Sequence, residues 1–192
     1  MGIKREQSLE DMFTSTGIKY SKADSMIEGL RSGIGKPNSL QVSLTNRCNL
    51  DCIFCSVKNR SRSEEWHYPH LISAISHFID VGVKTVEFSG GGEPTLYPEF
   101  NALAMYCKNR GLRLGLITNG TKLNKISNII LSIFDWIRIS MAALDYQEHL
   151  RLPNSWPDNT IIGLSYVVGQ KPAETDTRNY WESDRQQLLK IK

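Results

Sequence analysis

Three cysteines lie within one eight-residue segment of the chain, at Cys48, Cys52 and Cys55. The chain has four cysteines in all, so most of its thiols are concentrated there. Three thiols this close cannot all pair as disulfides, but as thiolates they can converge on one soft metal centre. A structural zinc site is closed by four protein ligands, and an iron–sulfur cluster usually takes four cysteines. Three cysteines would leave one iron of a cluster open to another ligand, which is typical of a catalytic centre.

Three further runs of residues could contribute to such a centre, and each also has an ordinary structural explanation. Residues 90–94 combine three glycines, which permit close approach of the backbone to a ligand, with the acid Glu93. The run lacks the lysine of a phosphate-binding loop, and it could equally be a helix N-terminal turn in which the dipole favours an acid. Residues 117–120 place Asn119 where an ordinary turn would suffice, and residues 137–140 end in a serine.

The four runs together resemble the signatures of one protein family. The cysteine spacing resembles the cluster-binding motif of the radical S-adenosylmethionine (SAM) superfamily, and residues 90–94, 117–120 and 137–140 resemble its second, third and fourth motifs. All four occur in the family's order, within roughly residues 39–170. The resemblance implies a barrel core of six β/α units, and an enzyme whose cofactors are a [4Fe–4S] cluster and SAM.

The resemblance also implies individual roles. The cluster ligands would be three cysteines: Cys48, Cys52 and Cys55. The positions that match the family's SAM pocket are Phe54, Gly91, Gly92, Glu93, Asn119 and Ser140. Of these, Phe54 would lie along the adenine, although plain packing would explain an aromatic ring there as well. Glu93 would accept hydrogen bonds from the SAM ammonium, and Asn119 and Ser140 would line the pocket around the ribose and methionine.

The activity implied by the resemblance is reductive cleavage of SAM to methionine and a 5′-deoxyadenosyl radical, which abstracts hydrogen from an unknown substrate. The implied partners are SAM, that substrate, and a one-electron donor of the flavodoxin or ferredoxin type. Two other functions stay open: a shortened, non-catalytic barrel that binds a cluster or SAM, and a zinc-stabilised interaction module closed by Cys107. The spacing of Cys107 from Phe100 and Leu103 argues against the zinc module, because it places this cysteine on the apolar face of a helix.

Strands alternating with helices would position these residues. The hydrophobic periodicity predicts strands at residues 39–44, 83–89, 112–118, 136–140 and 160–168. Helices are expected at residues 22–31, 68–79, 100–107, 122–134 and 180–191. This alternation indicates an α/β fold with a parallel sheet, in which binding residues collect at the carboxyl ends of the strands. Each of the four motifs lies at the end of a predicted strand, in agreement with that rule.

We therefore predict a partial (β/α) barrel of parallel strands, with about five β/α units of the six-unit radical SAM core. Residues 1–38 are expected to form a polar, helical N-terminal leader, and residues 39–192 the core domain, incomplete because the sixth strand is missing. Alternate strand positions carry polar residues, which indicates an open lumen that admits a polar ligand; peripheral strands facing water would explain them too. Within that lumen we expect Glu87 to pair with Arg138.

The composition of the chain is that of a soluble globular protein. It has 192 residues, of which 40% are hydrophobic and 22% charged, enough for one domain with its own core. A net charge of +3 is too small to indicate nucleic-acid binding, and the basic run at residues 58–62 is interpreted as a solvated loop. No apolar run approaches the roughly 20 residues that span a membrane, and neither a signal peptide nor a disulfide framework is evident. We expect a cytoplasmic protein, because a reducing compartment would also suit an oxygen-sensitive cluster.

Overall fold

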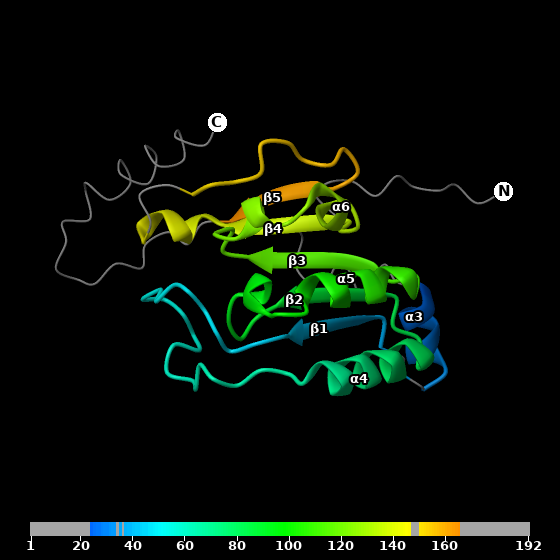
Figure 1. The fold of residues 1–192 in the computed structure, drawn as a ribbon. Helices are drawn as coiled ribbons and strands as arrows, with labels where there is room; N and C mark the ends of the chain where they lie inside the picture. Colours follow the sequence, from blue (N-terminus) through cyan, green and yellow to red (C-terminus); the bar gives the residue numbers. More distant parts are fainter. Residues whose placement is uncertain (1–23, 34, 36, 147–149, 166–192) are drawn as a thin grey trace, which may run out of the picture.

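The computed structural model describes residues 24–33, 35, 37–146 and 150–165. Its centre is one sheet of five parallel strands in the order β1-β2-β3-β4-β5 (Figure 1). The strands are β1 (Ser39–Ser43), β2 (Thr85–Ser89), β3 (Arg113–Thr118), β4 (Trp136–Ser140) and β5 (Ile161–Ser165). Each strand pairs in parallel with the next one in the sequence, so every connection has to cross back over the sheet. Helices provide the first three crossovers.

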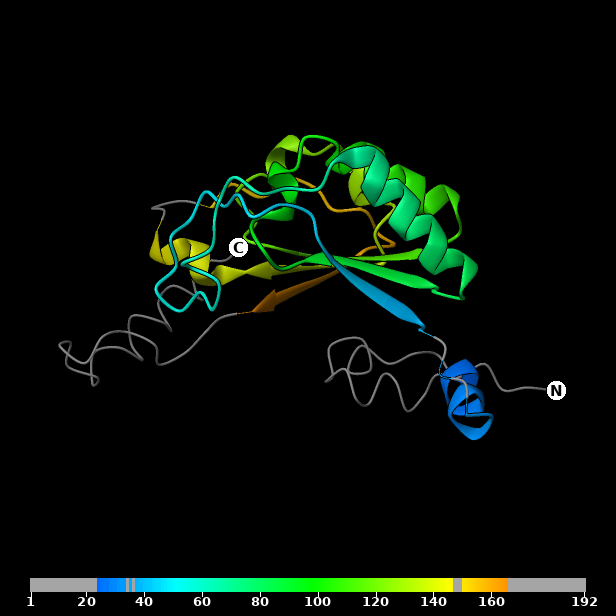
Figure 2. The same cartoon turned by 90° about the horizontal axis from the view of Figure 1, so that it is seen from below.

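Three α-helices cover one face of this sheet. They are α4 (Tyr68–Asp80), α5 (Phe100–Asn109) and α6 (Asn128–Leu131), and all three lie on the same side in Figure 2. The other described elements are the leading helix α3 (Asp24–Arg31) and three short 3₁₀ segments, η1 (Pro94–Leu96), η2 (Leu123–Lys125) and η3 (Met141–Asp145). Sequential parallel strands with helices on one face form a partial (β/α) barrel, so the predicted fold class is confirmed.

The hydrophobic core lies between the sheet and these helices. Alternate residues of the three central strands are fully buried in it: Val86, Phe88, Leu114, Leu116, Ile137 and Ile139. The rings of Phe88, Phe100 and Phe134 pack against one another there, with centroids 5.9, 6.2 and 6.0 Å apart. Burying one such side chain contributes roughly 1.5–3 kcal/mol, so this face holds the sheet and its helices together.

The opposite face of the sheet is more polar and more accessible. Gln41 and Ser43 on β1 are exposed, while Glu87 on β2 and Arg138 on β4 are half-buried. The Glu87 carboxylate accepts a hydrogen bond from Nε2 of Gln41 at 3.0 Å, and the expected pairing of Glu87 with Arg138 stays a prediction. The polar positions of the strands therefore share the face that α4, α5 and α6 leave uncovered.

One predicted helix, at residues 122–134, is wrong in its extent. The structure has the short turn η2 and then the four-residue helix α6 in its place. The side chain of Ser127 accepts a hydrogen bond from the backbone N–H of Ile130 and so starts a new helix, as serine does more readily than it continues one. The helix expected at residues 180–191 and the last part of the strand expected at 160–168 lie outside the described residues.

Candidate functional site

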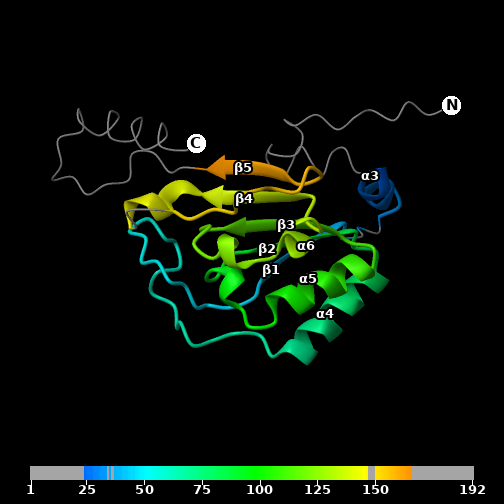
Figure 3. The same ribbon diagram turned by 45° about the horizontal axis from the view of Figure 1, so that its top comes forward.

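All four sequence motifs lie at the carboxyl end of the sheet. The cysteines follow β1, the glycine run follows β2, Asn119 follows β3, and Ser140 ends β4. Figure 3 shows the loop after β1 and the segment η3 after β4 next to each other, at the end toward which the strands point. Parallel pairing thus brings together residues that are far apart in the sequence.

The cysteines occupy a loop that is closed at its base. We call residues 45–65 the cysteine loop. An antiparallel bridge joins Thr45 to Glu65, where the loop begins and ends. The Glu65 carboxylate also accepts a hydrogen bond from the Thr45 hydroxyl at 3.2 Å and lies 2.7 Å from the guanidinium of Arg47. These contacts fix the base of the loop, so the cysteines can be held in place without regular secondary structure.

Part of the expected basic run folds back within the same loop. The side chains of Lys58 and Arg62 lie 3.5 and 2.6 Å from the carboxylate of Asp51, between the first and second cysteines. Lys58, Arg62 and Asp51 are all exposed to solvent, so each ion pair contributes at most about 1 kcal/mol. Lys58 and Arg62 are therefore solvated, as interpreted from the sequence, whereas Arg60 in the middle of the run is half-buried.

The three thiols of the cysteine loop are half-buried and free of disulfides. The backbone N–H of Cys55 donates to the carbonyl of Cys52 at 3.1 Å, so a tight turn joins the second and third cysteines. Burial, with the neighbouring Cys48 and Cys55, raises the pKa of Cys52 to about 11. In the part of the chain that the structure describes, no three His, Cys, Asp or Glu side chains form a group that could hold one metal ion. The loop carries all three thiols without converging them on one point, so a metal bound there would have to draw them together and displace their protons.

The fourth cysteine, Cys107, lies apart from the loop on α5. Its side chain is fully buried in the hydrophobic core, and this burial raises the pKa of its thiol to about 12. A free cysteine in such surroundings behaves as a small hydrophobic residue. The expected position of Cys107 on the apolar face of its helix is confirmed, which argues against a zinc site closed by this residue.

The glycine run packs directly against the base of the cysteine loop. The backbone N–H of Gly92 donates to the carbonyl of Thr45 at 2.6 Å. A Cβ on Gly92 would overlap the carbonyl of Arg47, and a Cβ on Gly91 would overlap the Ser43 hydroxyl. Gly91 also has a φ of +40°, which side chains disfavour. These glycines thus allow the backbone after β2 to pack closely against the end of β1 and the cysteine loop.

Glu93 connects the glycine run to the end of β3. Its side chain is only 2% exposed. Oε1 accepts hydrogen bonds from the Thr118 hydroxyl at 2.6 Å and from the hydroxyl and N–H of Thr95 at 2.6 and 3.1 Å, while Oε2 accepts from the N–H of Asn119 at 2.7 Å. Burial raises the pKa of Glu93, and these hydrogen bonds oppose the increase. The Glu93 carboxylate therefore links the glycine run to the residues at the end of β3. Its implied contact with the SAM ammonium stays a prediction.

Asn119 connects the end of β3 to the cysteine loop. Its side-chain amide nitrogen lies 3.0 Å from Oδ1 of Asn49 and 3.9 Å from Sγ of Cys48. Its Oδ1 accepts hydrogen bonds from the N–H and the hydroxyl of Thr121 at 3.0 and 2.7 Å. Asn119 is thus part of a turn, as its sequence context allowed. It also contacts the sulfur of Cys48 directly.

The remaining predicted pocket residues are less closely connected. Phe54 is half-buried in the cysteine loop, between the second and third cysteines. Ser140 is half-buried at the end of β4, where it pairs with Ser165 of β5 and precedes η3. Within the described residues neither side chain hydrogen-bonds to Glu93 or Asn119, so their roles rest on the resemblance.

Several residues of the site escaped the sequence analysis: Asn49, Thr95, Thr118, Thr121 and Tyr146. The phenolic oxygen of Tyr146, just after η3, accepts a hydrogen bond from the backbone N–H of Ile53 at 2.7 Å and so reaches the tip of the cysteine loop. Thr118 belongs to one of the motifs, and its position at the end of a strand is the sequence feature that could have identified it. The others are recognised only by their partners in space.

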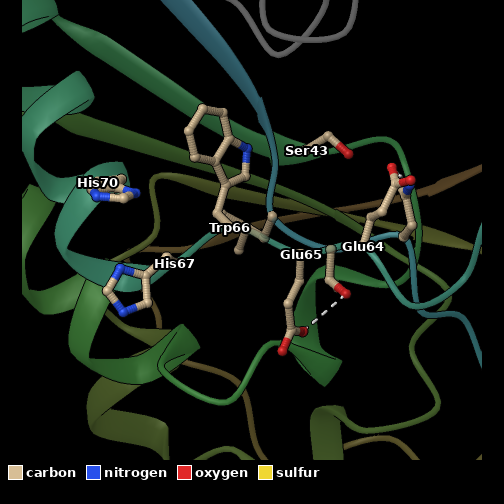
Figure 4. A pocket seen from close by; sticks show the side chains of 9 residues that line it. Ser43, Glu64, Glu65, Trp66, His67 and His70 are labelled. Atoms are coloured by element: carbon tan, nitrogen blue, oxygen red, sulfur yellow. Dashed lines mark hydrogen bonds between the residues drawn. The ribbon is translucent and has the colours of Figure 1, made fainter.

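A pocket of about 540 Å³ lies beside the cysteine loop, at its base. Figure 4 shows its labelled lining residues, Ser43, Glu64, Glu65, Trp66, His67 and His70, around the end of β1 and the start of α4. The imidazole rings of His67 and His70 contact each other edge to face at 5.0 Å. The pocket shares no residue with the predicted cluster ligands or SAM contacts, so we treat it as a separate feature.

The fold and the site define a class of protein, a parallel α/β partial barrel with a cysteine loop at the carboxyl end of its strands. The model of the radical SAM superfamily matches residues 42–161, which is more than half of the chain. This chain belongs to the radical SAM superfamily. Membership implies a [4Fe–4S] cluster and SAM as cofactors. None of the described helices is long and apolar enough to cross a membrane.

Several curated relatives have names that refer to GTP or to nucleotides. A probable GTP 3′,8-cyclase of Metallosphaera sedula is 34% identical over 119 residues, which cover 59% of this chain and 37% of the relative. An S-adenosylmethionine-dependent nucleotide dehydratase of a Thermoplasmatales archaeon is 24% identical over 126 residues, which cover 63% of this chain and 44% of the relative. The chain thus spans less than half the length of these relatives.

Solved structures share the fold. Streptococcus suis SuiB, bound to the precursor peptide SuiA, matches with a TM-score of 0.51 and 22% identity, over 73% of this chain and 33% of SuiB. SuiB bound to S-adenosylmethionine matches with the same TM-score and 23% identity, over 66% of this chain and 31% of SuiB. At this level of identity the likeness establishes a common architecture.

The residues of the site suit the cofactors of the family in their chemistry. Three thiols are the donors that iron–sulfur clusters take, and Asn119 brings an amide donor to one of them. The cysteine loop also buries Nη1 of Arg60, a donor without a hydrogen-bond partner in the described residues. Nε of Arg60 donates to the carbonyl of Asn46 at 3.4 Å, which holds this side chain near the base of the loop.

Proposed function

We propose that this chain is the catalytic core of a radical SAM enzyme, which cleaves SAM reductively and begins hydrogen abstraction from its substrate. The observation that supports this most strongly is the meeting of the four motifs at one end of the sheet, with the amide of Asn119 3.9 Å from the sulfur of Cys48. When bound, the cluster and SAM supply the one-electron chemistry, and the chain supplies binding, orientation and protection from water.

Individual roles follow from the resemblance and the geometry together. The three iron ligands in this proposal are Cys48, Cys52 and Cys55. The SAM contacts in this proposal are Phe54, Gly91, Gly92, Glu93, Asn119 and Ser140. Gly92 and Glu93 have a second task, because their backbone and side-chain hydrogen bonds hold the cysteine loop and the end of β3 in register.

The proposal extends to the organisation and partners of the protein. In this proposal residues 39–192 belong to the core domain, and residues 1–38 form a leader before it. The electron comes from a donor of the flavodoxin or ferredoxin type, because a cluster accepts one electron at a time. The cytoplasm is the proposed location, since its reducing conditions preserve thiolates and clusters.

Anaerobic reconstitution with iron and sulfide tests the proposal. We expect about four irons per chain, and, after reduction with dithionite, release of methionine and 5′-deoxyadenosine from SAM. A cluster without SAM cleavage would support the alternative of a non-catalytic binding protein. Tight zinc binding without any cluster would leave only the zinc-stabilised module.

Two cysteine variants sharpen this test. Cys52→Ala removes one of three proposed ligands and is expected to abolish the cluster, seen as loss of bound iron and of the absorption of the reconstituted protein. Cys107→Ala removes the core thiol and is the matched control, in which the cluster should remain. Retention of a full cluster by the Cys52 variant would contradict the assignment of the ligands.

A further inference from the structure

The three proposed ligands do not have the same surroundings. The sulfur of Cys48 has a side-chain amide nearby, Nδ2 of Asn119 at 3.9 Å, which is within the reach of a long N–H···S hydrogen bond. For Cys52 and Cys55 the described hydrogen bonds are local and involve the backbone: the N–H of Cys55 donates to the carbonyl of Cys52, and the N–H of Lys58 donates to the carbonyl of Cys55, both at 3.1 Å. In the described residues the sulfur of Cys48 therefore differs from the other two, because a side-chain donor from the end of β3 lies next to it.

The orientation of the Asn119 amide is fixed by its partners. Its Oδ1 accepts two hydrogen bonds from Thr121, so the NH₂ group has to face the cysteine loop. Asn49 is oriented in the same way, because its Oδ1 accepts from Asn119 while its own amide nitrogen donates to the Thr121 hydroxyl at 2.8 Å. The three side chains close a ring of hydrogen bonds in which neither amide can be turned over without losing partners.

The backbone of Asn119 is anchored as well. Its N–H donates to the buried carboxylate of Glu93, which also accepts from Thr118 on β3. A side chain whose backbone and amide oxygen are both held loses little further freedom when its NH₂ group makes a contact. Asn119 is therefore preorganised to donate toward Cys48.

We propose that Asn119 is a positioning residue that donates an N–H···S hydrogen bond to Cys48 and thereby raises the reduction potential of the cluster. The inference rests on the proposed function, because it requires Cys48 to bind the cluster, and it goes beyond the implied role of Asn119 in lining the SAM pocket. A hydrogen-bond donor stabilises the more negative, reduced state of a cluster more than the oxidised state. Its removal should make the cluster harder to reduce.

Two substitutions separate the hydrogen bond from added charge. Asn119→Ser removes the amide that reaches Cys48, and serine is compatible with the turn. Asn119→Asp keeps an oxygen for Thr121 but points a negative charge at the cysteine loop. The same two changes at Asn101, an exposed residue on α5, are the matched controls.

The readout is the midpoint potential of the reconstituted cluster, followed by electron paramagnetic resonance during a dithionite titration. We expect Asn119→Ser to shift the reduction equilibrium about tenfold toward the oxidised cluster, which is about 59 mV for one electron. Asn119→Asp should shift it further in the same direction, and both Asn101 variants should match the wild type.

Each other outcome has a definite meaning. A wild type that binds no cluster would defeat the proposed function and this inference with it. A wild type with four irons and an Asn119→Ser variant of unchanged midpoint would leave the proposed function standing and overturn the inference alone. Loss of the cluster in both Asn119 variants, with wild-type circular dichroism and thermal unfolding, would also overturn it, because Asn119 would then serve assembly and not potential.

Discussion

At the scale of single residues, the buried carboxylate of Glu93 links more of the site than any sequence motif indicated. It is 2% exposed and accepts hydrogen bonds from three residues, two of them at the end of β3. A buried charge with this many donors costs less than an isolated one, and it holds its donors in a single arrangement. Glu93 therefore determines how the glycine run and Asn119 sit relative to each other.

This burial predicts a pH dependence of stability. The pKa of Glu93 is raised above its ordinary value of 4.5, mainly by desolvation, so the folded protein keeps this proton to a higher pH than the unfolded chain. Its contribution to stability is then largest at low pH and is lost as the pH rises from about 4.5 through the folded pKa. We expect the free energy of unfolding of the wild type, relative to that of Glu93→Gln, to decrease over this window.

Urea unfolding of both proteins at several pH values measures this difference directly. Glu99→Gln, a change at an exposed acid before α5, is the control for general effects of removing a carboxylate. Because other carboxylates are common to all three proteins, their titration cancels in the comparison. Parallel pH profiles for the wild type and the Glu93 variant would contradict the expected linkage.

At the scale of elements, the glycine run and the cysteine loop behave as one folded piece. Gly92 donates to Thr45, and Glu93 donates its backbone N–H to Arg47 at 2.8 Å, so the segment after β2 is paired with the segment after β1. Neither segment is a strand there, yet their backbones are as close as in a sheet. Docking of this kind leaves no space for a side chain at the contact.

A methyl group at Gly92 tests that docking. Gly92→Ala would place a Cβ against the carbonyl of Arg47 and is expected to destabilise the protein by about 1–3 kcal/mol and to lower the iron bound on reconstitution. Gly35→Ala is the matched control, because a Cβ there meets nothing within 4 Å and its φ is not positive. Urea unfolding and iron analysis distinguish the two, and equal stability of both variants would show that the loops can separate without cost.

The sequence was sufficient for the elements whose pattern is local. Period-two alternation in β2 and β4 and the helical spacing of Cys107 reflect burial on one face, which is why these predictions are confirmed. The break at Ser127 was missed because apolar residues continue on both sides of it, and only the cap reveals two short elements. The partners of Glu93 and Asn119 were not predictable, because hydrogen bonds between strand ends depend on register and not on spacing along the chain.

At the scale of the whole molecule, the cysteine loop is held from three strands besides its own. The segments after β2, β3 and β4 each contribute a hydrogen bond, through Gly92, Asn119 and Tyr146. The loop therefore depends on the sheet as a unit, and the sheet depends on the core on its other face. A change that separated β4 from β3 would reach the cysteines although neither strand carries one.

Tyr146 hydrogen-bonds to the tip of the cysteine loop, and hydrogen exchange can measure how long this contact lasts. Ile53 exposes 49% of its side chain, yet its backbone N–H is bonded to the Tyr146 hydroxyl. Its amide hydrogen should therefore exchange with solvent more slowly than those of neighbouring loop residues, and Tyr146→Phe should speed exchange at Ile53 while leaving the β3 amides unchanged. Hydrogen exchange followed by nuclear magnetic resonance measures both rates. If Ile53 exchanges as fast in the wild type as in the variant, the tip of the loop is not held. If the Ile53 amide exchanges slowly in the wild type, its exchange rate measures how often the loop opens.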